Sequence, residues 1–529
     1  MKTDPFTLDV IQQALTAIAE EMFVILKRAS MSPIIYEVLD VGTGITDPDG
    51  EMVSSGAGIP GFIGVLDKSV KHLLTRIDKA SIRPGDVYIT NDPYYGGVTH
   101  LNDAVLAMPV FHDRELIAWT ANIGHWSDIG GSTPGSMPVD ARDIFAEGLR
   151  LPAIKLIEEG RAVQQVIDIM TVNSRLPDFL LGDMWAAVAA LRKGAERVER
   201  LATRYGVDMF AEAIRDYFDY AERQSRKGLA ALPQGRFEFH EPMDDGTVWD
   251  GAILVDEDSF TVDLRDGPPQ RDLPFNTSRE GSLVATQLIF KCATAPDTVC
   301  NGGSFRPLRL LTREGTIFHA LEPAPHSYYS EIRIRLADLL WRRLAEAAPD
   351  RFPAGGFASV CGTVIAGRHP DHGRRYTMVE PQMGGWGATS RRGGNSAMYS
   401  SNHGDTFNTP VEIAEARYGF LFSRYGLNHE PGGEGLHAGG PGLLKEFAIR
   451  GADTVLAAGY TRHKQPVWGL AGGKAGTTNR IQVIRRDGTT ETYAFASGVR
   501  LARGDVVRIT TARGGGWGSP PLTASNTAS

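Results

Sequence analysis

The chain contains little cysteine, no long apolar run and no excess of positive charge. Its three cysteines, Cys292, Cys300 and Cys361, are too scattered for a disulfide framework or a cysteine-based zinc cage, which favours a reducing compartment. The apolar runs fall far short of the ~20 residues that a membrane span needs. A formal net charge of −8 provides no general attraction to nucleic acid. We therefore expect neither membrane insertion nor nucleic-acid binding.

The first residues also lack the pattern of a secretory signal. The segment MKTDPFTLDVIQQALTAIAEEMF carries aspartate and glutamate inside its apolar pattern. A signal peptide instead has an uninterrupted apolar stretch after basic residues. Together with the low cysteine content, this predicts a cytoplasmic protein.

The residues that are present are typical of a soluble globular protein, with 42% apolar and 22% charged residues. A chain of 529 residues is too long for one core. Helical spacing dominates the first part of the chain and short alternating strands the second. We predict a mixed, multi-domain α+β protein. An N-terminal α/β region at 1–230 would carry a metal site, a β-rich region with a few helices would span 231–520, and 521–529 would be a disordered tail.

The first elements can be predicted from their periodicity. Apolar residues recur at helical spacing from Leu8 to Leu26, and Asp4 precedes them as an N-cap, so a first helix should end near Ser30. The segment IIYEVLDVGTGITDPDGEMVSSG then predicts a strand, a turn and a second strand. A further amphipathic helix is predicted over 65–77.

Glycine is abundant, with 60 residues. It is clustered at 384–387, 431–442 and 514–518, between apolar and aromatic flanks, which predicts close backbone packing within the chain or against a partner. The segment GGKAGTT at 472–478 resembles a phosphate-binding loop. However, it lacks the first glycine of GxxxxGK[ST] and has Ala475 in place of the hydroxyl residue, so we do not expect it to bind ATP.

A hairpin is the most informative local pattern. The apolar runs AVLAMPV at 104–110 and LIAWTANI at 116–123 flank the turn HDRE. If the turn centres near residue 113, residue 101 lies opposite residue 125. His100 and Asp103 would then lie at the same end of the hairpin as His125, and neighbouring strands are about 5 Å apart.

Two imidazoles and a carboxylate at one place suit a divalent transition metal such as Zn, Mn or Fe, with a position open for chemistry. Such an ion can polarise a carbonyl or generate a nucleophilic hydroxide near neutral pH. The alternative is that these side chains only satisfy backbone groups of a polar loop.

Several long segments resemble the hydantoinase B/oxoprolinase family, and the likeness covers nearly the whole chain. They include NDPYYGGVTHLNDAV, IGHWSDIGGSTPGSMPVDARDIFAEGLRLPAIKL, NGGSFRPL, EPQMGGWGA, GGEGLHAGGPG and GGGWGSP. The resemblance implies a hetero-oligomer with a partner subunit similar to actin/hexokinase-type ATPases. That partner would use ATP and Mg to phosphorylate the carbonyl or enol oxygen of the substrate, and the present subunit would complete the reaction at a metal.

The resemblance also implies a ligand set. In the carboxylase branch of the family the metal is bound by a glutamate, an HxxD pair and a later histidine, which map onto Glu37, His100, Asp103 and His125. Asp40 is a rival to Glu37, because the residue after Glu37 departs from the arginine usual in the family.

Three other residues are candidate catalytic groups. Asp92 or Asp128, beside the expected ligands, could orient a water or hold the second nitrogen of a ligand, or could simply cap a loop. His403, in SSNHGDTFNTP, could contact substrate, or could be a solvated or backbone-bonded loop residue. Glu147 is expected to be structural and to anchor the glycine turn that follows it.

Three functions are compatible with the resemblance. The first is the catalytic subunit of an ATP-dependent cyclic amide hydrolase, acting on hydantoin, N-methylhydantoin, 5-oxoproline or a larger lactam. The second is a subunit of an ATP-dependent ketone carboxylase of the acetone or acetophenone type, whose relatives tend to be longer than this chain. The third is a non-catalytic scaffold for the ATPase partner.

Overall fold

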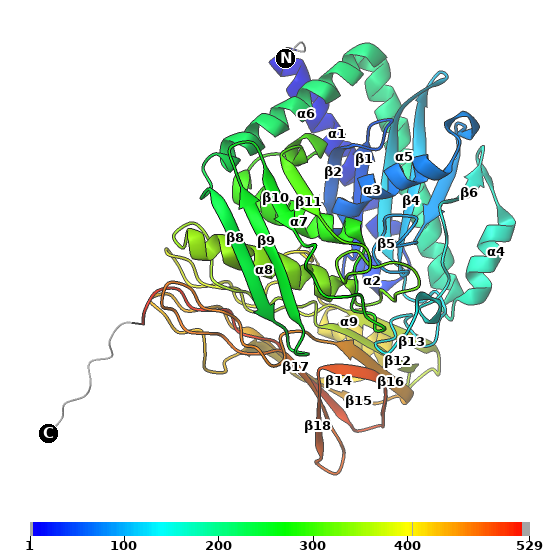
Figure 1. The fold of residues 1–529 in the computed structure, drawn as a ribbon. Helices are drawn as coiled ribbons and strands as arrows, with labels where there is room; N and C mark the ends of the chain where they lie inside the picture. Colours follow the sequence, from blue (N-terminus) through cyan, green and yellow to red (C-terminus); the bar gives the residue numbers. More distant parts are fainter. Residues whose placement is uncertain (1–3, 405, 521–529) are drawn as a thin grey trace.

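The computed structural model describes residues 4–404 and 406–520, so the predicted tail at 521–529 lies outside the described residues. It has the expected mixed α+β architecture, with separate sheets along the chain (Figure 1). The helices are α1 (Pro5–Ala29), α2 (Pro33–Tyr36), α3 (Pro60–Arg76), α4 (Gln164–Asn173), α5 (Pro177–Tyr205), α6 (Val207–Leu229), α7 (Arg279–Thr294), α8 (Tyr329–Ala347) and α9 (Val411–Tyr418).

A seven-stranded antiparallel sheet forms the centre of the N-terminal region, in the order β2-β1-β5-β4-β3-β6-β7. Helices α1, α5 and α6 cover one face and α3 the other. Successive side chains alternate between faces, so Leu106 packs in the first core and Val105 in the second. The strands are β1 (Val41–Thr46), β2 (Met52–Gly58), β3 (Val87–Thr90), β4 (Asp103–His112), β5 (Glu115–His125), β6 (Ile154–Glu158) and β7 (Arg161–Ala162).

The first helix agrees with its prediction. The Asp4 carboxylate accepts hydrogen bonds from the backbone N–H groups of Phe6 and Thr7, and α1 ends at Ala29. The helix predicted over 65–77 begins earlier, because Pro60 provides a preset first turn for α3.

The strand predicted at IIYEVLD is wrong over its first half. Pro33–Tyr36 form the short helix α2, and β1 begins only at Val41. Pro33 at the first helical position favours this turn. The buried Asp183 of α5 accepts hydrogen bonds from the backbone of Met31 and Ser32, which holds the chain at the entry to α2.

The chain changes from helix to sheet between Leu229 and Gly235, and the division into domains near residue 230 stays a prediction. A four-stranded sheet in the order β11-β10-β9-β8 packs with α7 and α8 around a further core, green in Figure 1. Its strands are β8 (Gly235–Pro242), β9 (Val248–Val255), β10 (Phe260–Asp263) and β11 (Leu308–Leu311).

Two more sheets enclose a fourth core near the C-terminal end of the described chain. One has the order β13-β12-β16-β19 and the other β14-β15-β20-β17-β18. Their strands are β12 (Gly362–Arg368), β13 (Arg375–Glu380), β14 (Phe420–Asn428), β15 (Gly442–Ile449), β16 (Ala452–Gly459), β17 (Arg480–Ile484), β18 (Thr490–Tyr493), β19 (Phe495–Leu501) and β20 (Val506–Thr510).

The glycine clusters pack against one another within the chain. A Cβ atom on Gly385 would lie 2.1 Å from the carbonyl oxygen of Gly440, and one on Gly439 only 1.9 Å from that of Gly514. Close backbone contact therefore requires glycine at these positions. The segment 472–478 is followed by strand β17 rather than by the helix that a phosphate-binding loop opens.

Among the described residues, no helix is both long and apolar enough to cross a membrane.

Candidate metal centre

The hairpin of β4 and β5 brings the expected residues together, in a register that differs from the prediction. Asp103 pairs directly with His125, whereas residue 101 was expected there. The turn centres between Asp113 and Arg114, since His112 pairs with Glu115, and a register shift between Val110 and Phe111 adds one more residue. Asp103 and His125 are therefore direct cross-strand neighbours.

The three potential ligand atoms form a compact triangle. Asp103 Oδ1 lies 3.1 Å from His100 Nε2 and 3.1 Å from His125 Nδ1, and the two nitrogens are 3.2 Å apart. Atoms bound about 2.1 Å from a shared ion lie about 3.0–3.4 Å from one another in octahedral or tetrahedral sites. The side chains are buried, with exposures of 6%, 0% and 4% for His100, Asp103 and His125. Donor type, spacing and burial therefore fit a divalent ion.

Contacts from the start of α8 orient His100. Its Nδ1–H donates to the carbonyl oxygen of Ser327 at 2.9 Å, which leaves Nε2 directed at Asp103. The buried Glu147 accepts hydrogen bonds from the backbone N–H groups of His326 and Ser327, both at 2.7 Å. Glu147 is thus structural, as expected, but it anchors the segment that holds His100. Its burial raises its pKa to about 7.

Hydroxyl groups orient the Asp103 carboxylate. Thr99 Oγ1 donates to Asp103 Oδ2, and the Tyr329 hydroxyl lies 3.3 Å from the same oxygen. The other oxygen, Oδ1, is left facing the two imidazoles. Gly97 has a φ of 63°, which allows the sharp turn before Thr99.

The three groups influence one another's protonation. Burial alone would raise the pKa of Asp103, but His100 and His125 outweigh it and hold this pKa well below its ordinary value. Burial alone would lower the pKa of His100, yet the Asp103 charge raises it. For His125, burial outweighs Asp103 and lowers the pKa. The carboxylate is therefore ionised and ready to bind a cation.

Asp40, rather than Glu37, lies beside this triangle. Asp40 Oδ2 is 4.0 Å from His125 Nδ1, and its Oδ1 is buried with no hydrogen-bond partner among the described residues. Burial, followed by the Asp103 charge, raises the pKa of Asp40 well above its ordinary value. Glu37 is a half-buried residue at the C-terminal end of α2. Within the described chain, the group of mutually close ligand atoms comprises His100, Asp103 and His125 alone.

Asp92 makes the contacts of a loop-capping residue. Its Oδ1 accepts hydrogen bonds from the backbone N–H groups of Tyr94 and Tyr95, both at 2.8 Å. Its Oδ2 lies 3.4 Å from Arg150 Nε. These contacts explain its burial without a role in chemistry, and such a role stays a prediction.

Asp128 has a similar environment. It accepts hydrogen bonds from the backbone N–H groups of Gly130 and Gly135 and pairs with Arg175 at 3.1 Å. A direct part in chemistry stays a prediction for this residue too.

His403 lies within electrostatic range of the triangle. It is buried, and burial followed by the charge of Arg333 lowers its pKa to about 3, so its imidazole is neutral at neutral pH. The charges of His100, Asp103 and His125 also act on it. His403 thus lies near the triangle, and its contact with substrate stays a prediction.

Sequence reasoning missed Ser327, Tyr329 and Arg333, which approach the site from the start of α8. The only local signal is the arginine at position 333 between two isoleucines in the stretch EIRIRL. In the structure all three of these side chains are buried. Nothing in that stretch indicates that it meets a hairpin more than 200 residues earlier.

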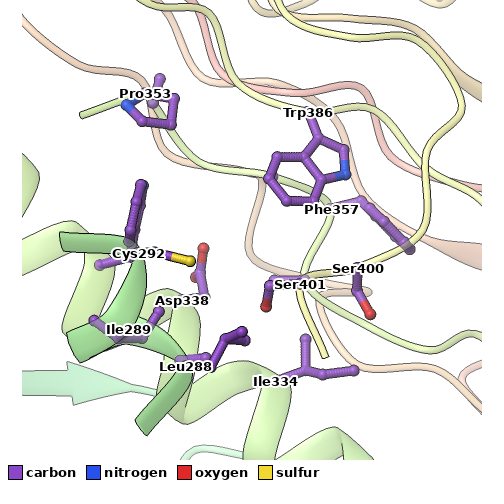
Figure 2. A pocket seen from close by; sticks show the side chains of 15 residues that line it. Leu288, Ile289, Cys292, Ile334, Asp338, Pro353, Phe357, Trp386, Ser400 and Ser401 are labelled. Atoms are coloured by element: carbon purple, nitrogen blue, oxygen red, sulfur yellow. The ribbon is translucent and has the colours of Figure 1, made fainter. Parts of the chain in front are cut away.

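An apolar cavity of about 100 Å³ lies beside the segment that leads to His403. In Figure 2, Leu288 and Ile289 of α7 and Ile334 of α8 lie across from Trp386. Ser400 and Ser401 line the cavity just before Asn402 and His403 in the chain; the other lining residues are Cys292, Ala337, Asp338, Trp341, Pro353, Ala354, Gly356, Phe357 and Ala358.

Comparison with known proteins agrees with this architecture. The beta subunit of the caprolactamase of Pseudomonas jessenii is 31% identical, over 98% of this chain and 91% of that subunit. The crystal structure of that ATP-dependent caprolactamase superposes with a TM-score of 0.90, at 28% identity, over 99% of this chain and 93% of that one. A nucleotide-free acetone carboxylase shares the fold, with a TM-score of 0.88 at 16% identity over 98% of this chain and 76% of that one. The profile of hydantoinase B/oxoprolinase matches residues 4–520, and the chain belongs to this family.

Proposed function

We propose that this chain is the catalytic subunit of an ATP-dependent cyclic amide hydrolase, acting on a hydantoin, 5-oxoproline or a lactam. The observation that carries the proposal is the buried triangle of His100 Nε2, Asp103 Oδ1 and His125 Nδ1, with edges of 3.1–3.2 Å. Similarity to a caprolactamase subunit over 98% of the chain supports the substrate class.

His100, Asp103 and His125 would hold one divalent ion, Zn, Mn or Fe, and Asp40 would complete the set by a small side-chain movement. Glu37 remains the competing fourth ligand. When bound, the ion supplies Lewis-acid chemistry to a carbonyl or phosphoryl oxygen. Hydrogen bonds from Thr99 and Tyr329 to Asp103 keep the donor set oriented before the ion arrives.

The partner would be an ATPase subunit that binds ATP and Mg. An amide carbonyl is a poor electrophile, and phosphorylation of its oxygen by the partner would create a good leaving group. The present chain would receive that species, exclude bulk water around it and position it beside the triangle. The apolar cavity beyond Ser401 could take the hydrocarbon part of a small ring.

The test is co-purification with a candidate ATPase subunit, followed by a panel of cyclic amides with ATP. Ring-opened product from the pair, but from neither subunit alone, is the expected result. Incorporation of labelled bicarbonate into a ketone would assign the carboxylase function instead. An ATPase that is stabilised by this chain, while a metal-free chain remains fully competent, would identify a scaffold.

A further inference from the structure

Arg333 is an unusual residue for a protein interior. Its side chain lies on α8 with an exposure of 2%, and it makes no ion pair with a carboxylate among the described residues. Its Nη2 lies 3.4 Å from Asn402 Oδ1, whereas Nε and Nη1 have no hydrogen-bond partner within the described chain. Burial of an unpaired guanidinium is costly, so a partner that satisfies it is expected.

The guanidinium lies next to the candidate metal centre. It stacks over the ring of Tyr329, 5.1 Å from the centroid, and the hydroxyl of that ring contacts Asp103. The charge of Arg333 acts on both Asp103 and His403. Arg333 therefore lies behind Tyr329 on the same side of the site as His403.

Neighbouring backbone leaves room for this side chain. A Cβ atom on Gly61 would lie 2.1 Å from Arg333 Nη2, so only glycine fits there without displacing the guanidinium. The Gly61 N–H donates to the carbonyl oxygen of Asn402 at 3.1 Å, which joins the start of α3 to the segment that carries His403. Nδ2 of Asn402 is a further buried donor without a hydrogen-bond partner among the described residues.

The charge balance favours an anion. Asp40 and Asp103 would neutralise a divalent ion in the triangle, and the Arg333 cation would then remain in excess. Arginine presents a planar fork of donors that matches the oxygens of a phosphoryl or carboxylate group. Ile334 follows Arg333 on α8 and Ser401 precedes Asn402, and both line the apolar cavity.

We propose that Arg333, with Asn402, binds an oxyanion of the substrate beside the metal centre, and that this oxyanion is the phosphoryl group transferred from ATP by the partner. The inference rests on the proposed function and extends it: the chain would recognise the activated, phosphorylated form of the substrate rather than the free amide. Arg333 would hold the phosphoryl oxygens while His100, Asp103 and His125 face the reacting carbon.

The first test measures the binding of inorganic phosphate to the full chain by calorimetry. Arg333→Met should weaken binding by roughly 10- to 100-fold, because a charge-assisted hydrogen bond is lost. Arg333→Lys should weaken it less. Arg343→Met is the matched control, since Arg343 lies on the same helix and pairs with Glu346 at 2.8 Å. Elemental analysis should show the same metal content in all four proteins.

A second variant covers the case in which Arg333→Met does not fold. Gly61→Ala keeps every charge but pushes the Arg333 guanidinium aside, so phosphate binding should fall while circular dichroism and metal content stay unchanged. Phosphate affinity that is equal in the wild type, Arg333→Lys and Gly61→Ala would overturn the proposal.

Bicarbonate binding tests whether the bound oxyanion is a phosphoryl group or a carboxylate. If Arg333→Lys and Gly61→Ala weaken bicarbonate binding and leave phosphate binding unchanged, the phosphoryl assignment is overturned and a carboxylate takes its place. The proposed function fails separately, by a lack of amide turnover in the wild-type complex. Phosphate binding to the wild type and the variants can be measured whether or not the complex turns over an amide.

Discussion

Nδ1 of His100 donates a hydrogen bond to the carbonyl oxygen of Ser327 at 2.9 Å, across 227 positions of the chain. A carbonyl oxygen can only accept, so Nδ1 carries a proton and Nε2 is the ring nitrogen left to bind a metal once it is deprotonated. Nε2 faces Asp103 Oδ1 at 3.1 Å. The segment that leads into α8 thus fixes which ring nitrogen of His100 is available to a metal, which the β4–β5 hairpin could not do alone.

Replacement of His125 with alanine should remove a metal ligand. We expect metal content and amide turnover to fall together, with affinity for the ion at least about tenfold weaker. Elemental analysis of purified wild type and variant measures this. His240→Ala is the control, because His240 is an exposed histidine that pairs with Asp250 on the surface. Equal metal content in wild type and His125→Ala would mean that the triangle is a polar loop contact.

Asp40 and Glu37 can be separated by isosteric variants. Asp40→Asn should weaken metal binding by about 10- to 100-fold, since Asp40 Oδ2 lies 4.0 Å from His125 Nδ1. Glu37→Gln should leave it within about twofold, because its side chain lies outside the group of close ligand atoms. Titration with Zn²⁺ or Mn²⁺ decides between them. The reverse order of effects would restore Glu37 as the fourth ligand.

The buried Glu147 should make stability depend on pH. Its pKa is raised to about 7 from 4.5, so the folded state holds this proton more tightly than the unfolded state. Its contribution to stability is full below pH 4.5 and is lost as pH rises to about 7, at about 1.4 kcal/mol per pH unit. Glu147→Gln keeps the acceptor for Ser327 N–H and cannot ionise. The difference between the Tm of Glu147→Gln and that of the wild type should therefore increase as pH rises across this window.

The melting curves of Glu147→Gln and the wild type are compared with a chelator present, so that a bound ion does not change the charge near Glu147. Melting curves whose difference between variant and wild type is the same at pH 5 and pH 7 would contradict the assignment.

The chain alone should not hydrolyse ATP. The segment around Lys474 is packed among glycine backbones, and the Lys474 carbonyl oxygen accepts a hydrogen bond from the Gly516 N–H at 3.0 Å. No helix N-terminus follows it to bind phosphate, since the next element is β17. A coupled ATPase assay on the partner-free chain measures this. Turnover that Lys474→Ala abolishes would contradict it.

Local patterns in the sequence predict much of the architecture. The Asp4 cap and the apolar spacing of α1 indicated that helix, and the apolar runs around residue 113 indicated the β4–β5 hairpin. These features depend on neighbours a few residues apart, which is why they can be read without tertiary structure. The register could not be read in this way, because a later turn centre and one bulge moved the partner of His125 from residue 101 to Asp103.

From the sequence alone, an aspartate and a histidine can be placed at one end of the hairpin, with His100 three residues before Asp103. The surroundings of these three residues depend on the tertiary structure. Ser327 and Arg333 reach the site because α8 packs against it, and Asp40 does so because its carbonyl oxygen accepts the His125 N–H at 3.0 Å. Such contacts depend on how separate cores pack against one another. A local periodicity in the sequence does not indicate which distant side chains this packing brings together.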